Sequence, residues 1–293
     1  MGERMQLFAF VLIIAAAVMH ASWNLFAKIS KNILAFMWWA TVIGTLGYGL
    51  WLLAGPGLLL APSSHIPFLI SAICETGYFV TLVKGYSRGD LSLVYPISRG
   101  SAPIFAALLS AFFLGESLPW LGYVGIALMV VGIYVASQPV DQSKIKFQFS
   151  SVISDPAVGW SLASAVFIAI YSITDKMAVV ATTPPIYNWW VFAGNSIFWA
   201  PFVWRRFHFK MNIDELRNNW RSMIVTSVLM VGAYALVLEA LALTSASYVV
   251  AGRGLSVVIG ACLGSFMLKE RFGAIRIVGA TVMVVGLALM AFS

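Results

Sequence analysis

Long apolar runs separated by short polar links occupy almost all of the 293-residue chain. A helix needs about 20 apolar residues to cross a bilayer whose hydrocarbon core is about 30 Å thick. Ten runs are long enough, and they predict an all-α polytopic membrane protein with ten transmembrane helices. The runs are 7–27, 34–53, 66–83, 91–113, 120–136, 158–179, 186–204, 222–243, 247–268 and 274–291.

Two stretches of the chain match each other at a constant offset of 154. Between 99 and 132, thirteen of thirty-four positions are identical to their partners. Apolar composition accounts for matching valines and leucines, but not for an arginine, a glutamate and three glycines in register. The chain is therefore interpreted as a duplication, and a duplicated membrane protein is most often a transporter.

The duplication predicts a first repeat over 1–137, a linker over 138–157 and a second repeat over 158–293. Each repeat holds five predicted spans. Because five is an odd number, the second repeat enters the bilayer upside down relative to the first. The result is a pair of inverted repeats about an axis in the membrane plane.

Only 10% of the residues are charged, yet the net charge is +7. The basic residues cluster in the links that follow the odd-numbered spans. There they predict the cytoplasmic side, with both termini outside, rather than a nucleic-acid site. They are Lys28, Lys31, Lys84, Arg88, Lys144, Lys146, Arg205, Arg206, Lys210, Arg217, Arg221, Lys269, Arg271 and Arg276.

The link over 205–221 has Ile213, Leu216 and Trp220 among its charges. This pattern suggests an amphipathic turn lying in the membrane interface, and a solvated basic loop is the alternative.

Polar side chains recur at helical spacing inside the apolar runs, where charge is costly and usually faces a cavity or a partner. On these grounds we expect the substrate to contact eleven residues. They are His20, Trp23, Asn24, Glu75, Tyr78, Arg99, Tyr171, Ser172, Asp175, Glu239 and Arg253.

Two arginines occupy equivalent positions in the two repeats, Arg99 and Arg253. One interpretation is a pair of structural ion pairs, Glu75 with Arg99 and Glu239 with Arg253. The other is that at least one arginine meets an anionic group of the substrate. In the second case, Glu75 would be released on binding and would be the predicted group for proton coupling, with His20 as the next candidate.

Small and aromatic residues favour packing roles. Most of the tryptophans stand near predicted span ends, as in an aromatic belt. Two small-residue faces, one at Gly122, Gly125 and Gly132 and one at Gly260 and Gly264, predict helix packing, with homodimer formation as the alternative. Cys74 and Cys262 lie in apolar runs and are interpreted as small packing residues.

Leu114-Gly115-Glu116 with Gly125 and Gly132, and the corresponding Leu268-Lys269-Glu270 with Gly279 and Gly286, resemble the EamA-type repeat of the drug/metabolite transporter superfamily. The resemblance covers essentially the whole chain. It implies a ten-helix carrier that moves small metabolites by alternating access through one central cavity. Helix 247–268 departs from the pattern, with Val257 where the first repeat has Pro103.

The expected function is secondary-active transport of a small metabolite, such as an amino acid, an organic phosphate or a phosphonate-like compound. The alternative is export of cationic or amphipathic drugs or of a lipid intermediate. No motif for catalysis, a metal, a cofactor or ATP hydrolysis is recognised, so we do not expect an enzyme. The expected partners are a small-molecule substrate and the lipid bilayer. The expected location is a prokaryotic inner or plasma membrane.

Overall fold

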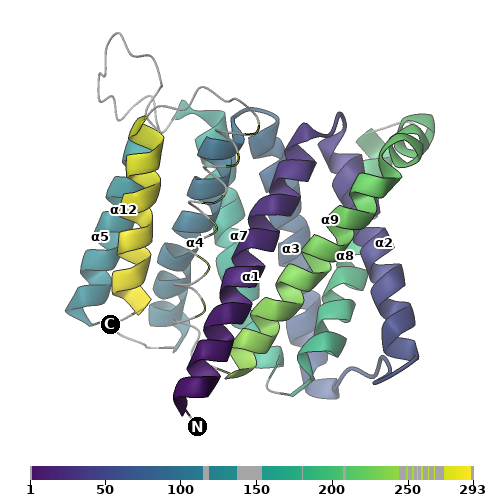
Figure 1. The fold of residues 1–293 in the computed structure, drawn as a ribbon, viewed down its shortest axis with the longest axis horizontal. Coiled ribbons are helices and arrows are strands. Elements are labelled where there is room, and N and C mark those ends of the chain that lie inside the picture. Colours follow the sequence, from purple (N-terminus) through teal and green to yellow (C-terminus); the bar gives the residue numbers. More distant parts are fainter. Residues whose placement is uncertain are drawn as a thin grey trace. The chain divides into compact units, whose positions relative to one another are not determined.

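The computed structural model describes residues 2–114, 119–136, 154–179, 181–206, 209–243 and 274–291, with single residues at 249, 253, 256, 259, 263 and 267. Every regular element in these ranges is helical (Figure 1). The elements are α1 (Gly2–Ile29), α2 (Ile33–Leu53), η1 (Pro62–Ser64), α3 (His65–Tyr86), α4 (Leu91–Leu114), α5 (Trp120–Ala136), α7 (Pro156–Ala178), α8 (Pro184–Arg206), α9 (Phe209–Leu243) and α12 (Ala274–Ala291).

The described helices coincide with nine of the ten predicted spans, and most ends agree within a few residues. The predicted span 247–268 lies almost wholly outside the described residues. Five helical segments in the described ranges are long and apolar enough to cross a membrane: Phe8–Ile29, Ile33–Leu53, Pro62–Tyr86, Pro156–Ala178 and Met211–Leu243. The chain is thus an all-helical, multi-pass membrane protein, and the count of ten crossings stays a prediction.

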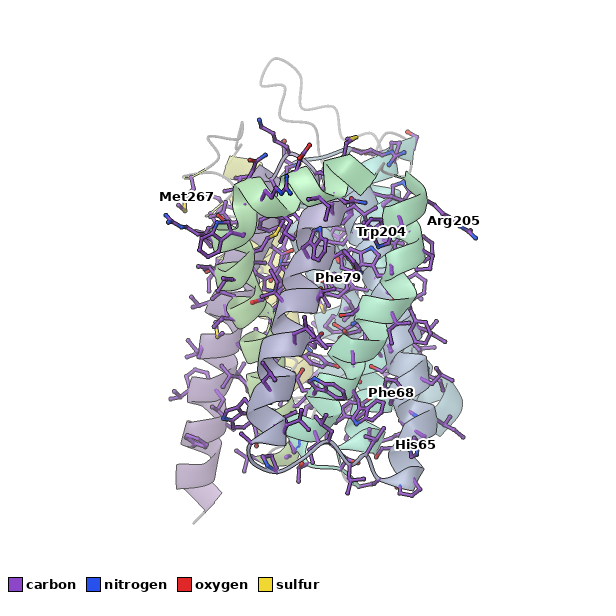
Figure 2. The ribbon with its side chains drawn as sticks, turned by 90° about the vertical axis from the view of Figure 1, so that its right-hand side faces the viewer. His65, Phe68, Phe79, Trp204, Arg205 and Met267 are labelled. Atoms are coloured by element: carbon purple, nitrogen blue, oxygen red, sulfur yellow. The ribbon has the colours of Figure 1, made fainter. Side chains whose placement is uncertain are left out.

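The largest difference from the sequence prediction is the start of α9, which begins at Phe209 rather than near 222. Its first turns start beside the end of α8, where Figure 2 labels Trp204 and Arg205. They lie at an angle to the rest of the helix. The Trp39 indole N–H donates to the Asn212 carbonyl at 3.0 Å, which fixes this segment to α2. Asn212 and Glu215 are buried, whereas Trp220 is exposed. The segment is therefore buried on one side, which carries the polar Asn212 and Glu215, and its predicted location in the membrane interface stays a prediction.

The chain divides into two compact units. The first contains residues up to 77 and 171–244, and the second contains 78–170 and the residues from 245. The boundaries fall inside α3 and α7, so each of these helices contributes to both units.

In the first unit, close contacts at glycines bring the helices together. A Cβ on Gly44 of α2 would lie 2.8 Å from Val231 of α9, and one on Gly194 of α8 would lie 2.7 Å from Ala72 of α3. Tryptophans add hydrogen bonds between helices. The Trp38 indole N–H donates to the Ser196 carbonyl at 2.9 Å, which links α2 to α8. Small residues and indole donors thus hold these helices at short distances.

In the second unit, α5 and α12 cross at glycines that are equivalent by the 154-residue offset. A Cβ on Gly132 would lie 2.7 Å from the Gly279 carbonyl oxygen, and one on Gly286 would lie 2.6 Å from the Gly125 carbonyl oxygen. The residue number decreases along α5, from 132 to 125, as it increases along α12, from 279 to 286. The two helices are therefore antiparallel. The predicted packing role of Gly125 and Gly132 is confirmed, and the antiparallel crossing of these two helices agrees with the predicted inverted repeats, which stay a prediction.

Candidate functional site

A buried carboxylate near the end of α7 joins four helices of the first unit. Asp175 accepts hydrogen bonds on Oδ1 from the Ser71 hydroxyl of α3 at 2.6 Å and from the Tyr187 hydroxyl of α8 at 2.9 Å. The Tyr234 hydroxyl of α9 donates to Oδ2. Asp175 is only 2% exposed. A carboxylate this far from water is stable only where polar groups surround it, and these three hydroxyls do so.

A second buried carboxylate, Glu75, follows Ser71 by one helical turn on α3. Its Oε2 accepts a hydrogen bond from the side-chain amide of Asn195 on α8. The oxygen of that amide in turn accepts from the Thr76 hydroxyl at 3.0 Å, which fixes the orientation of the amide. Glu75 is 4% exposed and Asn195 is fully buried.

The two carboxylates share their surroundings. Tyr187 and Tyr234 each lie close enough to both Asp175 and Glu75 to experience their charges, and so does Cys74. The Tyr171 ring, one turn before Asp175 on α7, packs edge-on against the Tyr234 ring with centroids 6.4 Å apart. We call Ser71, Glu75, Asp175, Tyr187, Asn195 and Tyr234 the carboxylate cluster.

The expected polar stripe on α1 is present and buried. The Trp23 indole N–H donates to His20 Nδ1 at 3.1 Å, and the Asn24 side-chain amide donates to the His20 carbonyl at 2.7 Å. His20, Trp23 and Asn24 are at most 6% exposed. Because Nδ1 accepts the hydrogen bond from the indole N–H, the neutral imidazole carries its proton on Nε2 in this arrangement.

In the second unit, Arg99 of α4 lies against Tyr78 of α3. The guanidinium donates from Nη2 to the Tyr78 hydroxyl at 3.1 Å and lies 5.2 Å from the centroid of its ring. Arg99 is 9% exposed and Tyr78 3% exposed. The contact combines a hydrogen bond with a cation–π interaction, so Tyr78 partly stabilises a charge buried among the helices.

The remaining expected residues lie in different environments. Ser172 is half-buried, as are Glu239 on α9 and Arg253. Lys176 is exposed, so it does not share the buried position of Asp175. The partners of the two predicted ion pairs, Glu75 with Arg99 and Glu239 with Arg253, fall in different units. Both pairings stay predictions.

Sequence reasoning missed four members or neighbours of the carboxylate cluster: Ser71, Tyr187, Asn195 and Tyr234. One usable signal was Asn195, an amide inside the apolar run of α8. The hydroxyl residues gave less signal, because serine and tyrosine are common in transmembrane helices without any ligand. Within the described residues, no group of three or more histidine, cysteine, aspartate or glutamate side chains gathers where a metal ion could bind.

The model of the EamA-like transporter family matches this chain twice, over residues 7–138 and 155–292. The two matches cover most of the chain and correspond to its two halves. No curated protein matches. A solved crystal structure of another protein superposes on this chain with a TM-score of 0.64. It is 13% identical, and the alignment covers 99% of this chain and 96% of that one, which shows a common fold alone.

Proposed function

We propose that this chain, which belongs to the EamA-like transporter family, is a secondary-active transporter of a small metabolite that carries an anionic group. The observation that carries the proposal is the buried Arg99, held against Tyr78 inside a helix of a membrane protein. An arginine at such depth is costly and usually serves a function. A guanidinium is always charged, and its planar donors match a carboxylate or phosphate.

The contact with Tyr78 positions the guanidinium for such a role. A guanidinium has five N–H donors, and one of them donates to the Tyr78 hydroxyl. An anionic substrate would bind Arg99 by charge-assisted hydrogen bonds while the tyrosine ring keeps the guanidinium in place. Candidate substrates are amino acids, organic phosphates and phosphonate-like compounds, and transport would proceed by alternating access.

The carboxylate cluster supports a second candidate function. Buried carboxylates beside aromatic rings are suited to a cation, and Tyr234 is flanked by the rings of Tyr171 and Phe192. This arrangement favours an exporter of cationic or amphipathic compounds. In the anionic-substrate proposal, the same carboxylates serve proton coupling instead.

A ligand screen on the purified protein tests the proposal. Melting temperature would be measured in detergent with amino acids, phosphorylated and phosphonate metabolites, and quaternary amines, because a bound ligand raises it by mass action. We expect an anionic compound to raise the melting temperature of the wild type but not of Arg99→Ala, which should remain inserted and folded.

A double variant separates a binding role from a structural one. If Arg99→Ala aggregates and Arg99→Ala with Glu75→Ala restores folding and transport, Arg99 is structural and the proposal is wrong. If only quaternary amines stabilise the wild type, and Glu75→Gln removes their effect, the exporter of cations is the function.

A further inference from the structure

The two carboxylates of the cluster are held by different kinds of donor. Asp175 is surrounded by the hydroxyls of Ser71, Tyr187 and Tyr234, whereas Glu75 accepts from the side-chain amide of Asn195. A hydroxyl can donate or accept a hydrogen bond, while an amide N–H can only donate. The chemistry of the two surroundings therefore differs once a proton arrives.

At Asp175, a proton can be bound without losing the hydrogen-bond partner. In the ionised state all three hydroxyls donate to the carboxylate oxygens. When Oδ2 takes up a proton, the Tyr234 hydroxyl turns its own hydrogen away and accepts the new O–H, while Ser71 and Tyr187 still donate to Oδ1. The charge of the group changes from −1 to 0 and no side chain needs to move.

At Glu75, the fixed amide favours the ionised state on the bonded oxygen. The Asn195 oxygen already accepts from the Thr76 hydroxyl, which orients the amide so that its N–H₂ faces Glu75. A proton on Oε2 would meet these N–H hydrogens rather than a lone pair. Protonation of Oε2 would break the contact or require the amide to turn against Thr76, so Glu75 keeps this contact only if it takes the proton on Oε1.

The titratable groups around Asp175 come from each helix that hydrogen-bonds to it. They are Cys74 and Glu75 on α3, Tyr187 on α8 and Tyr234 on α9, with Tyr171 on α7 itself. Lys176, the next residue on α7, is exposed. Asp175 lies three residues before the end of α7 at Ala178, within about one turn of the helix end.

We propose that Asp175 is the proton-binding residue of this transporter, and that it takes up and releases the proton that drives substrate movement. The assignment rests on the proposed function for the link to transport. Proton binding itself does not depend on any substrate. Ser71, Tyr187 and Tyr234 are positioning residues that satisfy the carboxyl in both of its states.

Infrared difference spectroscopy on the full-length protein in lipid nanodiscs tests the assignment without a substrate. A protonated carboxylic acid gives a carbonyl stretch that an ionised carboxylate lacks. We expect a pH-dependent carbonyl band in the wild type, its loss in Asp175→Asn, and its retention in the matched variant Glu75→Gln. Loss of the band in Glu75→Gln and retention in Asp175→Asn would overturn the assignment, as would a wild type with no titrating band.

Two milder variants keep the test decisive if Asp175→Asn fails to fold. Tyr187→Phe removes a donor to Asp175 and should shift the pH midpoint of the band, while Asn195→Leu removes the donor to Glu75 and should leave the midpoint unchanged. The opposite pattern assigns the proton to Glu75. Sodium titration at constant pH is the further control: a band that sodium abolishes in the wild type means that the cluster binds sodium instead.

Proteoliposomes then connect proton binding to transport. With a compound found in the ligand screen, Asp175→Asn should exchange substrate across the membrane but lose its accumulation under a pH gradient. Accumulation equal to that of the wild type would overturn the coupling role. A wild type that transports none of the compounds contradicts the proposed function instead and leaves the spectroscopic result standing.

Discussion

The two units hold their helices together by different means. In the first, Asp175 gathers hydroxyls from α3, α8 and α9 around one buried negative charge. In the second, α5 and α12 touch backbone to backbone at glycines, and neither contact involves a charge. The hydrogen bonds around Asp175 change in strength when the carboxylate binds a proton. The glycine crossing contains no group that ionises, so its strength does not change. We therefore expect the first unit to respond to pH and the second to stay constant.

The buried charges differ in the same way. Among the described residues, the carboxylates Glu75, Asp175 and Glu215 belong to the first unit and the arginine Arg99 to the second. Asp175 accepts hydrogen bonds from hydroxyls on three other helices, and Arg99 donates to the Tyr78 hydroxyl and lies over its ring. Because removing Asp175 leaves three buried hydroxyls without their acceptor, we expect it to cost more stability than removing Arg99.

Asp175→Ala should give the largest loss of stability. The change leaves three buried hydroxyls without their acceptor, and each unsatisfied group costs about 1–3 kcal/mol. We expect a total loss of about 3 kcal/mol or more, visible as a lower melting temperature by tryptophan fluorescence in detergent. Arg99→Ala is the matched comparison, and an equal loss in both variants would contradict the difference between the units.

Gly279→Ala should come next, in the second unit. Its new methyl group would lie 2.5 Å from the Ala136 nitrogen and 2.7 Å from the Gly132 carbonyl oxygen, so α5 and α12 must separate. Overpacking of this kind costs about 1–3 kcal/mol. Gly125→Ala should cost the same amount, because Gly125 is the position equivalent to Gly279 in the repeat and faces Gly286 at the same crossing.

Gly159→Ala is the control for these two variants, since a Cβ there would meet nothing within 4 Å. It should be neutral or stabilise the helix by up to about 1 kcal/mol. A destabilised control, or unequal losses at positions 125 and 279, would argue against the symmetric crossing.

Removing single hydroxyls should give smaller effects. Tyr234→Phe loses a hydrogen bond to a charged group, worth about 1.5–3 kcal/mol at most. Tyr78→Phe keeps its ring under Arg99 and loses only the hydroxyl, so we expect a smaller change. Melting temperatures measured across a pH series should separate the two: the effect of Tyr234→Phe varies with pH and that of Tyr78→Phe stays constant.

Lys176→Gln should have the smallest effect. The side chain is exposed, and surface substitutions usually change stability by less than about 0.5 kcal/mol. Transport and melting temperature should match the wild type. A loss of transport would add Lys176 to the expected substrate residues, beside Asp175.

The sequence predicts features that depend on neighbouring residues better than contacts between residues far apart in the chain. Apolar runs predict the helix ends well, because length and hydropathy are local properties. The start of α9 was predicted only as an amphipathic turn or a solvated loop over 205–221, because this segment has no apolar run from which a longer helix could be predicted. The glycine register revealed a packing face, since duplication repeats it. Asp175 was identified as polar inside a span, but its partners were not, because a single sequence does not show which helices lie side by side.

The glycine crossing also bears on how such a protein arose. Gly132 contacts Gly279, and Gly125 contacts Gly286. Exchanging the equivalent positions of the two repeats therefore turns one contact into the other. Two identical patches facing each other are what a two-fold dimer makes from separate copies of one chain. A five-helix ancestor that inserted in both orientations would have formed this same crossing between molecules. In that case, gene fusion would have needed to supply only a linker, because the surface joining the halves would already have existed.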